Sequence, residues 1–214
     1  MTRDTGKAIR ILTTLKKHRP NAKTELNYNT PLDFMVAVIL SAQATDIGVN
    51  KVTPSLFKKR KTPEDYINVS LEKLQKDIKS VNFYKTKAGR IQKACNVLIK
   101  NFGGKVPGEM DKLLEIPGIA RKSANVILQE IFGKSEGIVV DTHVTRLSNR
   151  LGWTKHPKNA IKIEKDLMKL FPKKYWRDIG NQLVHHGRYT CKAKKPLCNI
   201  CPISRLCPSA NINL

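Results

Sequence analysis

The sequence predicts an all-α fold. Apolar residues recur three and four positions apart along most of the 214-residue chain, as they do on the buried face of a helix. Two Thr-Pro-x-Asp segments, residues 30–33 and 62–65, provide the N-cap, the proline and the acidic residue that begin a helix. The one good strand candidate, residues 137–140, is too short to found a sheet.

In the N-terminal half, apolar patterns predict three helices besides the one that begins at residues 62–65. The stripe of Ile9, Leu12 and Leu15 predicts an amphipathic helix near the start of the chain. Residues 34–40 are apolar on all sides, which favours a central helix; a buried strand is the alternative, against which the capping signal argues. A longer helix should run over about residues 84–102, where a pair of glycines ends it.

The C-terminal half repeats this pattern in shorter stripes. Apolar residues spaced for a helix cover residues 144–151, 163–170 and 176–183. The last of these stripes leads into a cysteine-rich segment, so a helix is expected to end directly before it.

The chain is strongly basic. Its 40 Lys and Arg against 17 Asp and Glu give a formal net charge of +23. Such a surplus repels itself in the compact state, which favours a nucleic-acid partner over a merely well-solvated basic surface. The longest apolar stretch, residues 34–40, is far short of the roughly 20 residues that span a bilayer. We therefore expect no membrane partner, and the N-terminus lacks the apolar run of a signal peptide.

Four of the five cysteines form one short cluster. Cys191, Cys198, Cys201 and Cys207 are separated by six, two and five residues. Thiolates are soft ligands that suit zinc or an iron–sulfur cluster. Structural zinc usually takes two Cys-x-x-Cys pairs set well apart, whereas one pair here has a single cysteine on either side. The spacing favours a [4Fe–4S] cluster, with zinc as the alternative.

Residues 114–126 join two short helical patterns through a tight turn at Pro117 and Gly118. Glycine adopts the positive φ of such a turn at little cost. The backbone amides of Gly118, Ile119 and Ala120 then precede a helix, where free N–H groups and the positive dipole end form a site for one DNA phosphate. An ordinary helix–turn–helix corner is the alternative.

Two residues near this turn could carry covalent chemistry. Lys122 lies in the first helical turn, where the dipole and Arg121 disfavour the ammonium form and make a free amine more accessible. A free amine can attack an anomeric carbon and form a Schiff base; a solvated phosphate-binding lysine is the alternative. Asp141 follows residues 138–140 as a candidate N-cap, and a carboxylate there can also act as a base or as an electrostatic partner.

Taken together, the hairpin, the lysine, the aspartate and the cysteine cluster resemble endonuclease III, a family of DNA glycosylases and apurinic/apyrimidinic lyases. The resemblance covers essentially the whole chain and includes residues 40–46 and 140–143. It implies the two-lobed helix-hairpin-helix glycosylase fold with a C-terminal cluster loop. One lobe is a central helical barrel with the hairpin, residues 24–134; the other is a discontinuous iron–sulfur cluster domain, residues 1–23 plus 135–214.

The resemblance also implies individual roles. Lys122 is expected as the Schiff-base nucleophile, Asp141 as the catalytic carboxylate, and the four cysteines as the ligands of a [4Fe–4S] cluster. Gln43 is expected to fill the gap that an extruded base leaves, and Phe83 stands where the family has an aliphatic wedge. The residues expected to contact DNA are Gln43, Phe83, Pro117, Gly118, Ile119, Ala120 and Arg121. At Ala120 the family usually has a second glycine.

The expected function is the removal of oxidised pyrimidines from duplex DNA, followed by β-elimination at the abasic site. We expect a monomer, located in the cytoplasm with the nucleoid if the source is a prokaryote. One alternative is a monofunctional glycosylase for mispaired thymine or adenine, in which the position of Lys122 is typically not lysine. Another is a non-catalytic iron–sulfur DNA-binding protein, which would not need Lys122 and Asp141 together.

Overall fold

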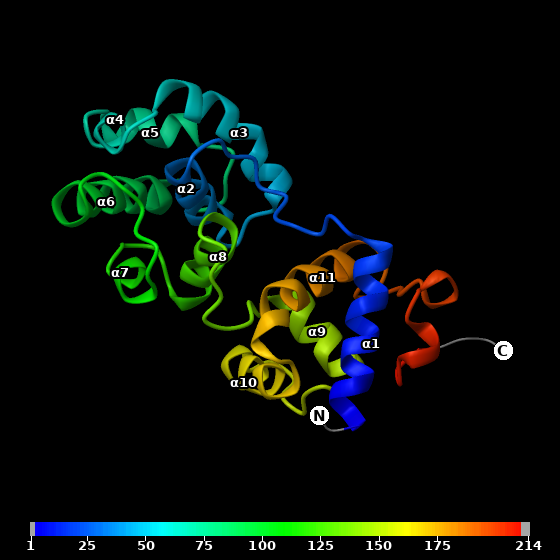
Figure 1. Ribbon diagram of the computed structural model, residues 1–214. Helices are drawn as coiled ribbons and strands as arrows, with labels where there is room; N and C mark the ends of the chain where they lie inside the picture. Colours follow the sequence, from blue (N-terminus) through cyan, green and yellow to red (C-terminus); the bar gives the residue numbers. More distant parts are fainter. Residues whose placement is uncertain (1–2, 211–214) are drawn as a thin grey trace. The chain divides into compact units, whose positions relative to one another are not determined.

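The computed structural model describes residues 3–210, and within them every regular element is a helix (Figure 1). The all-α prediction is therefore confirmed for this part of the chain. The packing forms two compact units. The central unit comprises Glu25–Lys134, and the terminal unit is built from both ends of the chain, up to Thr24 and from Ser135 onward. No helix within residues 3–210 is long and apolar enough to cross a membrane.

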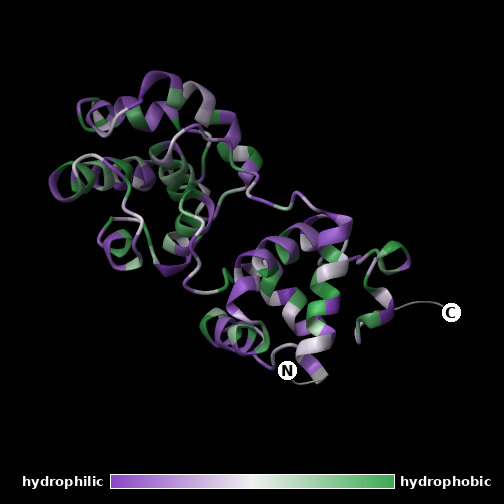
Figure 2. Ribbon diagram, in the orientation of Figure 1, coloured by the Kyte–Doolittle hydropathy of each residue, from purple (hydrophilic) through white to green (hydrophobic). Residues whose placement is uncertain are grey.

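The central unit is organised around one buried helix. Every residue of α2 from Leu32 to Leu40 is buried, because this helix is apolar on all sides. Helices α3, α6 and α8 pack around α2, and Figure 2 shows many hydrophilic residues on these outer helices. The helices of this unit are α2 (Pro31–Ser41), α3 (Asp46–Lys59), α4 (Pro63–Ile67), α5 (Leu71–Asp77), α6 (Tyr84–Phe102), α7 (Met110–Leu114) and α8 (Arg121–Ile131).

Both predicted capping boxes are present in this unit. The hydroxyl of Thr30 accepts from the backbone N–H of Asp33 at 3.1 Å, and the Asp33 carboxylate accepts from the N–H of Thr30 at 3.1 Å. Thr62 and Asp65 exchange the same pair of hydrogen bonds at the start of α4. These reciprocal bonds satisfy N–H groups that a helix start leaves without acceptors.

The terminal unit has its own apolar core. Its helices bury Leu12 and Leu15 of α1 against apolar residues of α9, α10 and α11. The strand candidate, residues 137–140, forms no strand and has no regular secondary structure. Gly180 of α11 packs against this segment: a Cβ atom there would lie 3.5 Å from the carbonyl oxygen of Val139, an ordinary van der Waals distance. The elements are α1 (Arg3–His18), α9 (Thr142–Arg150), α10 (Ala160–Leu170), η1 (Lys173–Tyr175), α11 (Trp176–Tyr189), η2 (Cys198–Ile200) and η3 (Ser204–Leu206).

Candidate functional site

The predicted hairpin is a tight turn between α7 and α8 in the central unit. The N–H of Ile119 donates to the carbonyl of Ile116 at 3.0 Å, with Pro117 second in the turn and Gly118 third. The φ of Gly118 is 93°, and a positive φ at the third position is typical of a type II turn, which favours glycine there. Ile116 and Ile119 are buried and anchor both ends, while Gly118 is exposed between them.

Helix α8 begins directly after this turn, with Ala120 as its N-cap. The N-cap alanine provides no side-chain cap for α8. The first N–H groups of a helix lack intrahelical acceptors and carry the positive end of the helix dipole. Arg121 and Lys122 are both exposed in this first turn. The order predicted from the sequence, a glycine turn followed by amides and then a lysine, is therefore present at the surface of the central unit.

Asp141 belongs to the terminal unit, whereas Lys122 belongs to the central unit. Asp141 is the N-cap of α9, and its Oδ1 accepts from the N–H of Val144 at 2.8 Å, which confirms the predicted cap. The carboxylate is half-buried. His143 lies in the first turn of α9, where its Nδ1 is 3.1 Å from a guanidinium nitrogen of Arg146, and burial lowers the pKa of His143.

Gln43 and Phe83 share an unusual backbone conformation. Within residues 3–210 they are the only residues other than glycine with a positive φ, 54° and 58°. Such a conformation is uncommon for any side chain and an outlier for a bulky one. Both side chains are exposed, Phe83 to 61%. The side-chain amide of Asn82 donates to the carbonyl of Gln43 at 3.2 Å, which brings the two loops together. Backbone strain clusters at functional sites, so both loops are candidates for binding.

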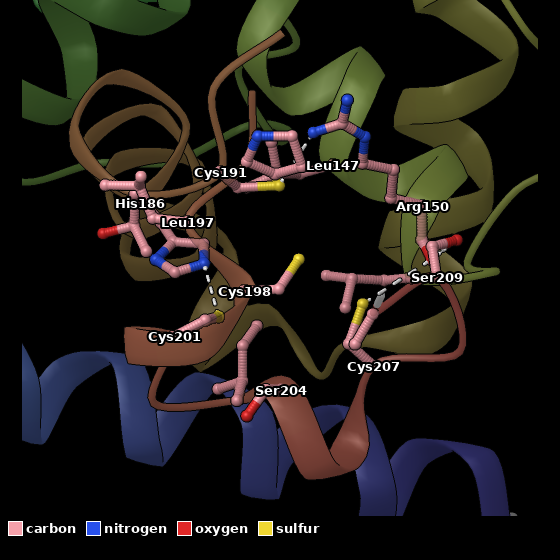
Figure 3. A pocket seen from close by; sticks show the side chains of 15 residues that line it. Leu147, Arg150, His186, Cys191, Leu197, Cys198, Cys201, Ser204, Cys207 and Ser209 are labelled. Atoms are coloured by element: carbon pink, nitrogen blue, oxygen red, sulfur yellow. Dashed lines mark hydrogen bonds between the residues drawn. The ribbon is translucent and has the colours of Figure 1, made fainter. Parts of the chain in front are cut away.

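The four cysteines line one cavity of the terminal unit, and Figure 3 shows their sulfur atoms around a common space. Short backbone hydrogen bonds shape the loop that carries them. The N–H of Leu197 donates to the carbonyl of Thr190 at 3.0 Å, and η2 and η3 turn the chain after it. All four cysteines are half-buried free thiols. The cavity is also lined by apolar and basic side chains, including Leu147, Arg150, Leu151, His186, Leu197 and Ile203.

Nitrogen atoms of two side chains approach the sulfur atoms. Nη1 of Arg150 donates to Sγ of Cys191 at 3.1 Å, and Nε2 of His186 lies 3.5 Å from Sγ of Cys201. Burial lowers the pKa of His186 to about 4, so its ring is neutral. Burial also raises the pKa of the Cys201 thiol, which stays protonated unless a metal displaces the proton. Within residues 3–210 no three His, Cys, Asp or Glu side chains are grouped so as to hold a metal ion.

Sequence patterns did not single out Asn82 or Lys87. Lys87 is 2% exposed, and its Nζ donates to the carbonyl of Leu40 at 2.7 Å. One signal was available: Lys87 lies four residues before Ile91, on the apolar face of the predicted helix, where a lysine is rarely fully buried unless it is paired. The pattern contains no information about the partner, which lies 47 residues earlier in the chain.

Comparison with known proteins identifies the family. Residues 36–173 match the model of the HhH-GPD superfamily base excision DNA repair proteins. Endonuclease III of Synechocystis sp. is 47% identical over 204 residues, covering 95% of this chain and 93% of the relative. Endonuclease III of Bacillus subtilis is 47% identical over 188 residues, covering 88% and 85%.

Solved structures agree with these relatives. The structure of a trapped endonuclease III–DNA covalent intermediate superimposes with a TM-score of 0.90 at 43% identity, covering 98% of this chain and 97% of that one. A thermostable thymine-DNA glycosylase superimposes with a TM-score of 0.84 at 22% identity, covering 96% and 97%, which shows a shared fold. The chain therefore belongs to the endonuclease III family, within the HhH-GPD superfamily of base excision DNA repair proteins.

Proposed function

We propose that the protein removes oxidised pyrimidines from duplex DNA and then cleaves the strand at the resulting abasic site. Its relatives at 43–47% identity include endonuclease III proteins, one of them in a trapped covalent intermediate with DNA and one in a non-covalent DNA complex. The net charge of +23 supports a polyanionic partner, because each neutralised phosphate releases counterions.

The observation that carries this proposal is the position of Lys122. A covalent intermediate with DNA requires a nucleophile, and Lys122 is an exposed amine in the first turn of α8, directly after the hairpin turn. The amides of residues 118–120 would bind one DNA phosphate, with Pro117 and Arg121 beside them. That arrangement would bring a sugar close to the Lys122 amine.

The proposed reaction begins with extrusion of the damaged nucleotide, because C1′ of a stacked nucleotide cannot be reached. Nζ of Lys122 attacks C1′, and the base leaves with the electron pair of the glycosidic bond and takes up a proton. The sugar ring then opens to an imine on Lys122. The imine acidifies the C2′ proton, whose removal expels the 3′ phosphate. Water finally hydrolyses the imine and restores the amine.

We assign Asp141 a catalytic role beside its structural one. Its cap hydrogen bond uses Oδ1, and a carboxylate has acceptor capacity beyond one such bond. In the proposed reaction the carboxylate stabilises the positive charge that develops during base loss, or relays protons between Lys122 and the leaving group.

The four cysteines are proposed to hold a [4Fe–4S] cluster. In a cubane each thiolate binds a different iron, so the four sulfur atoms surround a space and need not converge on one ion. A shared cavity with an Arg150 hydrogen bond to Cys191 supports this donor set. The bound cluster would supply folding free energy to the loop. We accordingly propose the terminal unit as the cluster domain and the central unit as the helical barrel, in a monomer associated with the nucleoid.

The test uses a duplex that contains one thymine glycol. The purified protein should release the modified base and leave a nick on the 3′ side of the lesion without added alkali. Base release that leaves an intact strand, cleavable only by alkali, would indicate a monofunctional glycosylase. Binding with neither base release nor a nick would indicate a non-catalytic DNA-binding protein.

A further inference from the structure

We propose that Lys87 and Asn82 are positioning residues. They hold Gln43 and Phe83, before DNA binds, in the backbone conformation from which both side chains insert into duplex DNA. The inference rests on the proposed function, because it assumes that Gln43 and Phe83 enter the duplex. It adds two residues to which the sequence patterns assigned no role, and it explains how two strained loops keep their conformation.

The first cross-link joins Lys87 to the end of α2. The last carbonyl groups of a helix lack intrahelical donors, and a cation nearby is stabilising. Helix α2 has no basic residue in its last turn. Lys87, on α6, supplies that cation through its 2.7 Å hydrogen bond to the carbonyl of Leu40. Burying an ammonium group is costly unless it is hydrogen-bonded, so this contact fixes the end of α2 relative to α6.

The loop after α2 holds Gln43 in a tight turn. The N–H of Ala44 donates to the carbonyl of Ser41 at 3.1 Å, and Ala42 has the φ of −58° and ψ of 115° of a type II turn. Gln43 occupies the third position, where such turns prefer glycine. A longer side chain there carries strain, so the turn needs support from its neighbours. The hydrogen bond from Asn82 to the carbonyl of Gln43 provides it.

Phe83 adjoins both residues through the backbone at the start of α6. Phe83 is the N-cap of α6 in the left-handed conformation, with no side-chain cap. The backbone N–H of Lys87 donates to the carbonyl of Phe83 at 3.0 Å, while the side chain of the same lysine holds Leu40. Asn82 precedes Phe83 directly and bonds to Gln43. Two side-chain hydrogen bonds therefore link the segment around Phe83 to the end of α2 and its loop, one from Asn82 to Gln43 and one from Lys87 to Leu40.

This arrangement lowers the ordering cost of insertion. Exposed loops that must order on binding lose conformational entropy and therefore affinity. Here both backbones are already fixed, so the exposed side chains of Gln43 and Phe83 can enter the space that an extruded nucleotide leaves. Loss of one cross-link should populate other loop conformations and reduce the fraction of molecules competent for insertion.

The experiment measures insertion directly. The probe is a duplex with a tetrahydrofuran abasic analogue opposite 2-aminopurine, whose fluorescence reports stacking beside the lesion. Asn82→Ala removes one exposed hydrogen bond, so it should lower the insertion equilibrium by about fivefold, as expected for one net hydrogen bond, and should lower the melting temperature no more than Asn101→Ala does. Lys87→Met keeps the length of the side chain but removes the donor, and should lower the insertion equilibrium at least as far. The matched control is Asn101→Ala, which removes an exposed asparagine amide and its hydrogen bond to Glu115 near the other end of α6.

The outcomes separate the inference from the proposed function. If Gln43→Ala and Phe83→Ala leave the fluorescence change and affinity at wild-type values, the proposed DNA contacts fail. If those variants lose insertion while Asn82→Ala inserts as well as wild type, or as well as Asn101→Ala, the positioning role is wrong. Because Asn82 is exposed, this comparison holds even if Lys87→Met fails to fold. Amide ¹⁵N relaxation of residues 42–44 and 83 should show increased mobility in Asn82→Ala and none in Asn101→Ala.

Discussion

Replacement of Gly118 by alanine should weaken DNA binding through the backbone alone. A Cβ atom at Gly118 would lie 3.5 Å from the side chain of Arg90, which is an ordinary van der Waals contact. The cost therefore comes from the φ of 93°, and a left-handed conformation costs an alanine about 1–2 kcal/mol. If the turn relieves this strain by changing its conformation, fewer molecules keep the turn that binds a DNA phosphate. The affinity for an abasic duplex should then drop by about 5- to 30-fold.

Gly133→Ala is the matched control for this prediction. Gly133 also belongs to the central unit and has a φ of 65°, with nothing within 4 Å of an added Cβ atom. Both variants should therefore lower the free energy of unfolding by about 1–2 kcal/mol in denaturant titrations. Fluorescence anisotropy should show weaker DNA binding for Gly118→Ala only. Equal losses of affinity in the two variants would mean that global destabilisation, and not the hairpin turn, is responsible.

Three further outcomes are expected. Cys198→Ser should lose visible absorbance and the roughly four irons per chain that one cubane requires, whereas one zinc per wild-type chain would contradict the cluster. Affinity for duplex DNA should fall by about 10³-fold or more between 50 and 200 mM salt if six or more phosphates are bound. An affinity that does not change with salt would exclude binding through phosphate contacts. Burial raises the pKa of Asp77, but hydrogen bonds from Lys59 and buried Arg60 outweigh it and hold that pKa low. The ion pairs of Asp77 stabilise the fold above the unfolded-state pKa of about 3.9, and this stabilisation is lost as the pH falls through the lower pKa of the folded state. Asp77→Asn should therefore abolish this acid dependence and lower the free energy of unfolding by about 3 kcal/mol at neutral pH.

The helices could be predicted from the sequence because their signals are local. The Thr30 and Thr62 capping boxes involve residues three apart, and the continuous apolar run of α2 is enough to predict that this helix is buried. The limits of local information are visible at residues 137–140, whose apolar run is compatible with a strand. The segment forms no strand and packs instead against Gly180 of α11, a contact that no local pattern contains.

The candidate site divides in the same way. The hairpin turn, the Asp141 cap and the grouping of the four cysteines follow from spacing and turn chemistry, which act over a few residues. The contacts that support the two strained loops cannot be predicted from such local features. They require Lys87 to reach a carbonyl of α2 and Asn82 to reach Gln43, and both contacts join segments about 40 residues apart or more in the chain.

The nucleophile is the central claim, and borohydride trapping on abasic duplex DNA tests it most directly. The wild-type protein should form a covalent adduct, and mass spectrometry should map the modified residue to Lys122. Lys122→Gln should bind the abasic duplex and yet give neither adduct nor nick, while Lys112→Gln, in an exposed lysine of α7, should trap as wild type does. Asp141→Asn should slow base removal and keep DNA binding. A trapped adduct in Lys122→Gln, or an adduct mapped to another residue of the wild-type protein, would contradict the assignment.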